Sequence, residues 1–330
     1  MPGRDLPWRA SVLWDYLLFR SATCKPPTLN SELSALAYSS VRYGHILPVS
    51  KYEQPALLYK QIRRMRAQLK LDAVSAANGD RTVLDPEQCT PLDNNDVAFL
   101  FAAYGVYDRG SFLSSDRPVR HHLFANAVQY TAAMRFGHFI YRAYRVDDFV
   151  FRRDCWLLRT TWHRYPDRKV HVLRFPVAPE WECMFFEVPD THGNVSVLTA
   201  ASVIDWHFST LEQSDLVFEP VVAEDVSRTQ RQRWLRYSFM EAIHSPSPKV
   251  TAALRSITPH AFRSGIGGSL KREGASPKEI ASVCRWASKR AAALYVTDRP
   301  PLSKIRASSE MVRLSPHRRS AIWRRAHASR

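Results

Sequence analysis

The chain has 330 residues and a mass of 37.9 kDa, which exceeds one typical domain and predicts two domains with separate cores. Hydrophobic residues make up 45% of the sequence, a proportion that excludes a mostly disordered chain. Lys and Arg number 47 against 31 Asp and Glu, giving a formal charge of +16, which favours a partner that presents phosphate groups. Composition alone is also compatible with a basic protein whose charge only keeps it soluble or attracts it to an anionic membrane surface.

The cysteines predict neither a zinc site nor a disulfide framework, because the five of them lie far apart without a Cys-x-x-Cys pair. A reducing compartment fits this usage. The N-terminus lacks the apolar stretch of a signal peptide, and no window approaches the ~18 apolar residues of a membrane span. We therefore expect a soluble intracellular protein that needs no membrane, metal or other cofactor.

The N-terminal part is predicted to be helical. Residues 33–71 carry apolar residues at helical spacing, interrupted by a loop at 45–48. Cations surround the apolar stripe of the second half, which suits a helix that lies on DNA: Lys60, Arg63, Arg64, Arg66 and Lys70. A solvated basic face explains this pattern equally well.

The second part mixes helices with a hairpin. Residues 72–95 are rich in small, polar and turn-forming types and predict a linker. Helical periods cover 97–107 and 121–146. Two alternating, β-rich segments, 156–164 and 169–177, flank a turn and predict a β-hairpin.

The remaining C-terminal segments return mainly to helical periods. Residues 182–188 and 196–201 are compatible with strand or helix. Helical segments are predicted at 231–243, 260–273, 277–287 and 289–296, with Gly274 and Pro277 marking a helix end and the next helix start. The last residues, 315–330, are expected to form a basic tail, for which the sequence leaves helix or irregular structure open.

Four residues near the C-terminus form a specific pattern. His260 and Arg263 make a His-x-x-Arg motif, Trp286 follows 23 residues after Arg263, and Tyr295 follows nine residues later. This pattern resembles the tyrosine recombinase (phage integrase-like) family, which places a His or Trp and a nucleophilic Tyr at these spacings. Alone, Tyr295 and Trp286 would be interpreted as packing residues. Their joint spacing favours the functional interpretation.

The resemblance also implies a first catalytic arginine, on a helix before the hairpin. Arg135 is the best match, with Arg142 and Arg145 as alternatives. His138 stands where the family usually has an acidic residue that supports the site, so this chain departs from the pattern there.

The family's catalytic lysine belongs on the hairpin. Lys169 lies directly after the predicted turn and is the only lysine between Lys70 and Lys249. Arg164 and Arg168 are substitutes as cations, but arginine is a poor proton donor because it does not deprotonate in proteins.

Cleavage of a phosphodiester requires a nucleophile and neutralisation of the charge on the non-bridging oxygens. Tyr295 would be the nucleophile, and Arg135 and Arg263 would present planar, multidentate donors to the phosphate oxygens. This arrangement needs no metal ion.

The remaining residues would move or hold protons. His260 would act as a base for the phenol, Lys169 would protonate the leaving 5′-oxygen, and Trp286 would donate its indole N–H to the scissile phosphate. The 3′-phosphotyrosyl link retains the bond energy, so a 5′-hydroxyl can reseal the strand without ATP.

The resemblance implies a mainly α fold with a small antiparallel β-sheet, in which a helical core-binding domain precedes the catalytic domain. We expect the core-binding domain at 1–80, a linker at 81–95, the catalytic domain at 96–300 and a basic tail at 301–330. The implied partners are double-stranded DNA and three further copies of the chain, in a homo-tetramer assembled on DNA, with the tail docking on a neighbour as one hypothesis.

The expected activity is site-specific recombination in DNA integration or mobile-element transposition. A type IB topoisomerase shares the chemistry but usually carries Lys-x-x-Arg at this motif. A catalytically inactive DNA-binding descendant of a mobile element is a further alternative, whereas an RNA-binding module is not recognisable. The location would be the nucleus for a eukaryotic mobile element and the cytoplasmic nucleoid for a bacterial one.

Overall fold

The computed structural model describes residues 89–134, 144–161, 170–213, 215–218, 228–258, 260–286 and 299–328, together with Tyr16, Phe19 and Arg20. The chain divides into two compact units, Met1–Glu87 and Gln88–Arg330, and this division falls within the segment expected to be the linker. The predicted basic helix at 57–70, with its five candidate DNA-binding cations, lies outside the described residues.

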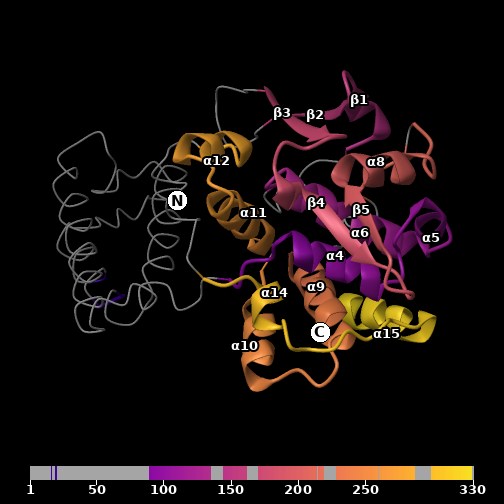
Figure 1. The fold of residues 1–330 in the computed structure, drawn as a ribbon, viewed down its shortest axis with the longest axis vertical. Coiled ribbons are helices and arrows are strands. Elements are labelled where there is room, and N and C mark those ends of the chain that lie inside the picture. Colours follow the sequence, from indigo (N-terminus) through magenta and orange to yellow (C-terminus); the bar gives the residue numbers. More distant parts are fainter. Residues whose placement is uncertain are drawn as a thin grey trace, which may run out of the picture. The chain divides into compact units, whose positions relative to one another are not determined.

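The described elements of the second unit are mostly helices (Figure 1). The helices are α4 (Asn94–Ala103), α5 (Arg109–Leu113), α6 (Arg117–Thr131), η2 (Val146–Asp148), η3 (Glu182–Met184), α8 (Ala200–Phe208), α9 (Arg228–Ala242), α10 (Pro248–Ser256), α11 (Ala261–Arg272), α12 (Pro277–Val283), α14 (Leu302–Ile305) and α15 (Pro316–His327). The strands are β1 (Phe149–Phe151), β2 (Cys155–Thr161), β3 (Val170–Pro176), β4 (Phe185–Pro189) and β5 (Val195–Thr199). The predicted class, mainly α with small antiparallel sheets, is confirmed.

Strands β1, β2 and β3 form an antiparallel sheet in that order. The β2–β3 hairpin confirms the predicted one. The strand β1 was not predicted, because three residues are too few to show a period. It joins β2 through a two-residue turn at Arg153 and Asp154, which have φ values of +47° and +57°. This primed turn geometry matches the twist of the strands, although glycine or asparagine usually occupies it.

The sheet has one buried and one open face. Leu158, Leu173 and Phe175 are buried on the side that packs against α8. The indole of Trp156 fixes this contact, since its Nε1–H donates to a carboxylate oxygen of Asp205 at 2.8 Å. The exposed Arg174 alternates with the buried residues along β3 and therefore points to the other face.

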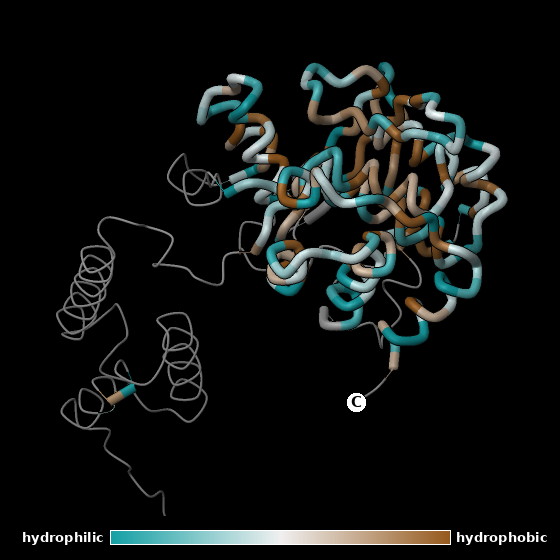
Figure 2. The backbone as a smooth tube through the Cα atoms, turned by 60° about the horizontal axis from the view of Figure 1, so that its bottom comes forward, coloured by the Kyte–Doolittle hydropathy of each residue, from teal (hydrophilic) through white to brown (hydrophobic). Residues whose placement is uncertain are grey.

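A second, two-stranded sheet pairs β4 with β5. Its residues 185–189 confirm a strand where the sequence left strand or helix open. The chain passes directly from β5 into α8, whose first turn is closed by a capping box between Thr199 and Ser202. In Figure 2 the hydrophobic segments gather in the interior of this unit, and the hydrophilic ones lie mainly on its outside.

Helix α11 approaches the start of the second unit closely. The amide of Leu92 donates to the carbonyl of Ala261 at 3.1 Å. A Cβ atom built on Gly265 would lie 1.7 Å from the carbonyl oxygen of Leu92, so only glycine fits there. The helix ends as predicted at Gly274, where φ is +88°, and α12 begins with Pro277.

The segment expected to be a separate basic tail is instead packed on the second unit. Helix α15 lies against α9, and Ile322 and Ala326 are fully buried. Leu302 of α14 is also fully buried, and its amide donates to the carbonyl of Pro91. The apolar residues at helical spacing within the basic sequence account for this packing.

Among the described helices, none has the length and apolar character required to cross a membrane.

Two buried histidines lie in contact in the core. The rings of His121 on α6 and His207 on α8 are 4.6 Å apart, and Nε2 of His207 lies 3.0 Å from the carbonyl oxygen of Val217. Burial, with the charge of Arg117, lowers the pKa of His121 to about 4. Burial and the proximity of His121 lower the pKa of His207 to about 3. Both rings are therefore neutral at physiological pH.

We predict that alanine at Gly265 destabilises the protein by at least about 2 kcal/mol, because its Cβ cannot fit without moving α11 from Leu92. Urea unfolding measures the change. Alanine at Gly110 is the control, since its Cβ would meet only a carboxylate oxygen of Asp108 at 3.5 Å, and it should be neutral or stabilising by up to about 1 kcal/mol. Equal unfolding midpoints for the two variants would contradict the close approach.

We predict that stability falls as the pH drops below 6.5. Between about pH 6.5 and 4 the unfolded chain binds protons at His121 and His207, whereas the folded chain does not, so each histidine costs about 1.4 kcal/mol per pH unit. Replacing His121 with Gln should reduce the slope of the unfolding free energy against pH in this window. His317→Gln, at an exposed position, serves as the control. An unchanged slope in the His121 variant would refute the prediction.

Candidate active site

Helix α11 carries two of the predicted catalytic residues on its first turn. His260 is the N-cap residue, is half-buried, and accepts a backbone hydrogen bond from Ser264 at 3.1 Å. Its own amide donates to the hydroxyl of Thr258 at 3.2 Å. Arg263 lies one turn further along and is fully buried. The His-x-x-Arg spacing therefore places both side chains at the same end of one helix.

Helix α6 leads directly towards the predicted first arginine. It ends in a Schellman motif, in which the amide of Met134 donates to Gln129 and that of Ala133 donates to Tyr130, both at 2.9 Å. Ala133 takes the left-handed conformation, with φ of +45°, although it is not glycine. This ending leaves carbonyl groups of the last turn in need of hydrogen-bond donors.

Helix α12 ends in a second motif of the same kind. The amide of Trp286 donates to Ala281 at 2.8 Å, and that of Arg285 donates to Ser282 at 3.1 Å. Arg285 has φ of +50°, so an arginine occupies the position that usually carries glycine. The turn directs the chain into Trp286, whose side chain is only 6% exposed.

Two guanidinium groups bind the C-terminal end of α6. Arg263 donates from Nη1 to the carbonyl of Ala133, and Arg285 donates from Nη2 to the carbonyl of Ala132. Cations at this position complement the partial negative charge at the C-terminus of α6. Two carbonyls shortly before Arg135 thus accept hydrogen bonds from Arg263, a predicted catalytic residue, and from Arg285, which precedes Trp286 in the sequence.

Arg263 also contacts Trp286 directly. Its Cζ atom lies 5.4 Å from the centre of the indole ring, within the range of a cation–π interaction. Burial raises the pKa of the adjacent Cys284 thiol to about 12, although the charges of Arg263 and Arg285 act in the opposite direction. Cys284 is therefore a neutral packing residue rather than a nucleophile.

The structure brings Arg263 into contact with Trp286 and places His260 at the same end of α11 as Arg263. The other three predicted catalytic residues, Arg135, Lys169 and Tyr295, lie outside the described residues, as do the alternatives Arg142, Arg164 and Arg168 and the supporting position His138. Arg145 is described: it is exposed, and its backbone pairs with Leu216. Within the described part of the chain, no group of three or more His, Cys, Asp or Glu residues is arranged to hold a metal ion.

The sequence did not single out Arg285, although it lies next to Trp286. An isolated arginine in a basic chain carries no signal. Its role follows from the left-handed turn and from the bond to Ala132, both of which depend on tertiary structure.

Comparisons with known proteins give distant structural similarities. No family model matches the sequence, and no curated protein matches it. Similar solved structures include the XerH site-specific recombinase bound to a palindromic difH substrate in a post-cleavage complex, with 11% identity and a TM-score of 0.38. That match covers 66% of this chain and 52% of the XerH chain, so this chain spans about half the length of that protein.

The Tn1549 transposon integrase is similar in two DNA complexes. With circular intermediate DNA the identity is 14%, the coverage is 92% of this chain and 94% of that chain, and the TM-score is 0.37. With transposon right end DNA the identity is 16%, the coverage is 90% and 96%, and the TM-score is 0.40.

We predict different stabilities for two substitutions at Arg285. Glycine and alanine both remove the bond to Ala132, but only glycine adopts the left-handed turn without strain, so Arg285→Gly should be about 1 kcal/mol more stable than Arg285→Ala. Urea unfolding of the two variants measures the difference. Equal stability would show that the turn at Arg285 is not left-handed in solution.

Proposed function

We propose that this protein is a tyrosine recombinase, which cleaves and rejoins duplex DNA through a covalent 3′-phosphotyrosyl intermediate. The observation that carries the proposal is the contact of Arg263 with Trp286, two residues of the family's motif, with the third, His260, at the N-cap of the helix that carries Arg263. Arg263 is also bound to the chain two residues before Arg135. The resemblance in spacing is thus accompanied by proximity in space.

In this proposal His260 takes the phenol proton of Tyr295, and the phenolate oxygen attacks the scissile phosphorus. The bond from phosphorus to the 5′-oxygen breaks, a phosphotyrosyl bond forms at the 3′ end, and Lys169 gives its proton to the leaving 5′-oxygen. Arg135 and Arg263 donate to the non-bridging oxygens. A guanidinium has five N–H donors, so Arg263 can hold the Ala133 carbonyl and donate to phosphate from the same planar group.

The family resemblance extends the proposal to the biological role. Exchange of strands between two duplexes requires four cleavages, so the active form would be a homo-tetramer assembled on DNA. The reaction would serve DNA integration or transposition of a mobile element. The basic composition, with a pI near 9.9, supports duplex DNA as the partner.

The burial of Arg263 favours a second candidate, a catalytically inactive DNA-binding protein. Its side chain has no exposed surface, and part of its donor capacity is used on Ala133. A phosphate oxygen reaches such a group only if the structure around it opens when DNA binds. The two candidates differ in whether a covalent protein–DNA product forms.

We predict covalent capture of DNA without metal or ATP. The protein is incubated with a library of nicked, random-sequence duplexes, denatured in detergent, and the protein-bound DNA is sequenced. Tyr295→Phe should reduce capture by at least about 100-fold, because phenylalanine lacks the attacking oxygen. Tyr237→Phe is the matched control on α9 and should capture like the unchanged protein.

The sequences of the captured DNA separate the alternatives. A shared motif supports a site-specific recombinase, whereas capture without a motif favours a type IB topoisomerase. Duplex binding without any capture would contradict the enzymatic proposal and leave the inactive DNA-binding protein.

A further inference from the structure

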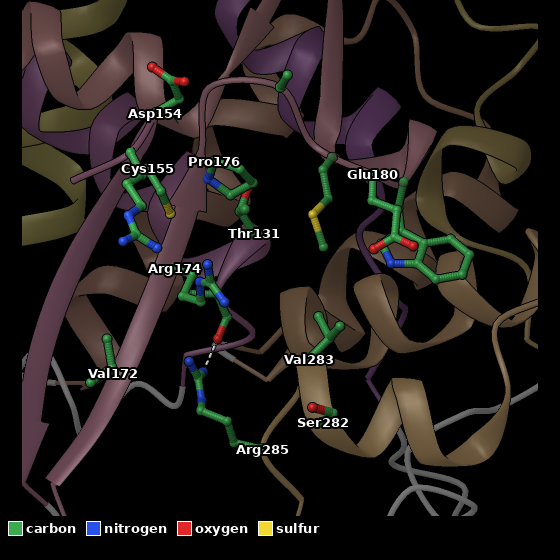
Figure 3. A pocket seen from close by; sticks show the side chains of 15 residues that line it. Thr131, Asp154, Cys155, Val172, Arg174, Pro176, Glu180, Ser282, Val283 and Arg285 are labelled. Atoms are coloured by element: carbon green, nitrogen blue, oxygen red, sulfur yellow. Dashed lines mark hydrogen bonds between the residues drawn. The ribbon is translucent and has the colours of Figure 1, made fainter. Parts of the chain in front are cut away.

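A cavity of about 600 Å³ lies beside the candidate active site (Figure 3). Its walls are the open face of the β1–β3 sheet, the loop around Trp181 and the end of α12. Ala132 and Arg285, which join the helix ends of the candidate site, also line this cavity. The cavity therefore borders the groups that hold the end of α6, and its lining includes none of His260, Arg263 and Trp286, the predicted catalytic residues that the structure describes.

Among the described residues, the lining combines three arginines with two carboxylates. The arginines are Arg153, Arg174 and Arg285, and the acids are Asp154 and Glu180, so the described lining has a net positive charge of one. In the described part of the chain, no ion pair joins Arg153 or Arg174 to either acid, although all lie on the same cavity. The exposed guanidinium of Arg174 is therefore available to pair with a bound anion.

A buried hydroxyl in the wall points to the same kind of ligand. Thr131 ends α6 and is only 4% exposed, and its hydroxyl has no hydrogen-bond partner among the described residues. A buried polar group without a partner costs free energy, and such groups in native proteins usually have one, from the protein, water or a ligand. Figure 3 shows Thr131 and Arg174 on the same side of the cavity.

We propose that this cavity binds one backbone phosphate of duplex DNA, next to the phosphate that is cleaved. Arg174 pairs with the phosphate oxygens, Arg285 adds positive charge while it holds the Ala132 carbonyl, and Thr131 donates its hydroxyl. A phosphodiester carries a single negative charge, which matches the net charge of the lining better than a phosphate monoester does. The inference rests on the proposed function, because it takes duplex DNA as the substrate.

This phosphate contact has a structural consequence for the reaction. A phosphate held by Arg174 and Arg285 fixes the duplex relative to the sheet and to the end of α6, and hence relative to Arg263. Such contacts set the register of the protein on DNA without reading its sequence. Arg174 is therefore a positioning residue, not a catalytic one.

The test is the salt dependence of DNA binding by the full chain. Binding of a fluorescent 30-base-pair duplex is followed by anisotropy over a series of salt concentrations. Arg174→Gln should weaken binding several-fold at low salt and reduce the slope of log K against log salt by about 1, as expected for the loss of one phosphate contact. Arg109→Gln, at an exposed position on α5, is the control and should leave the slope unchanged.

A second measurement places the DNA at the cavity. Ser282→Cys introduces a thiol at the exposed rim, and its alkylation by a maleimide, followed by mass spectrometry, should slow at least about tenfold when the duplex is added. Ser114→Cys, at the exposed C-cap of α5, should react at the same rate with and without DNA. An unchanged salt slope in Arg174→Gln, or no protection at Ser282→Cys, overturns the inference.

The test of the phosphate site and the test of covalent capture can fail independently. Tyr295→Phe should lose covalent capture and keep the salt slope of the unchanged protein. Capture with an unchanged slope in Arg174→Gln would refute the cavity site alone. A reduced slope and rim protection without any capture would retain the phosphate site and refute the recombinase.

Discussion

The hydrogen bond from the buried guanidinium of Arg263 to the carbonyl of Ala133 is the interaction on which the candidate site depends. It joins α11, which carries the His-x-x-Arg motif, to the end of α6, which leads into Arg135. The contact with Trp286 joins the same guanidinium to the end of α12. One side chain therefore connects three segments that lie far apart in the sequence. A buried arginine is stable in such a place only when its charge meets acceptors, and the carbonyl end of α6 supplies them.

Two other constraints keep these segments in place. Gly265 allows α11 to lie directly on the backbone of Leu92, and the left-handed residues Ala133 and Arg285 turn the chain sharply at the ends of α6 and α12. Non-glycine residues in this conformation cost about 1 kcal/mol or more each. Backbone strain of this kind often clusters at functional sites, where the surrounding structure holds it in place.

The sequence predicted those parts of the fold that have a clear period or a clear stop signal. The β2–β3 hairpin, α9, α11 and the break at Gly274 follow from alternation, helical spacing and turn chemistry. The short strand β1 has too few residues for such a signal, and α8 follows β5 without an intervening turn residue. The charge of the C-terminal segment led to the prediction of a basic tail. In the structure the segment packs on α9, because Ile322 and Ala326 are buried there.

The same distinction applies to the site. The spacing of His260, Arg263 and Trp286 made them candidates, because the family pattern fixes distances along the chain, and the structure places Arg263 against Trp286. Neither the role of Arg285 nor the cavity with Arg174 could be predicted, since both depend on which helix ends and strand faces come together. The sequence pattern thus predicts which residues are catalytic, whereas tertiary contacts show that Arg285 and the cavity lined by Arg174 lie beside them.

The central claim is that Tyr295 becomes covalently linked to DNA, and mapping of the adduct tests it most directly. The captured complex is digested with nuclease and trypsin, and the peptide that carries the remaining nucleotide is sequenced by mass spectrometry. We predict that the nucleotide is on Tyr295, within the tryptic peptide 291–304, attached through a 3′-phosphate. A nucleotide on any other residue, or one linked through a 5′-phosphate, would contradict it.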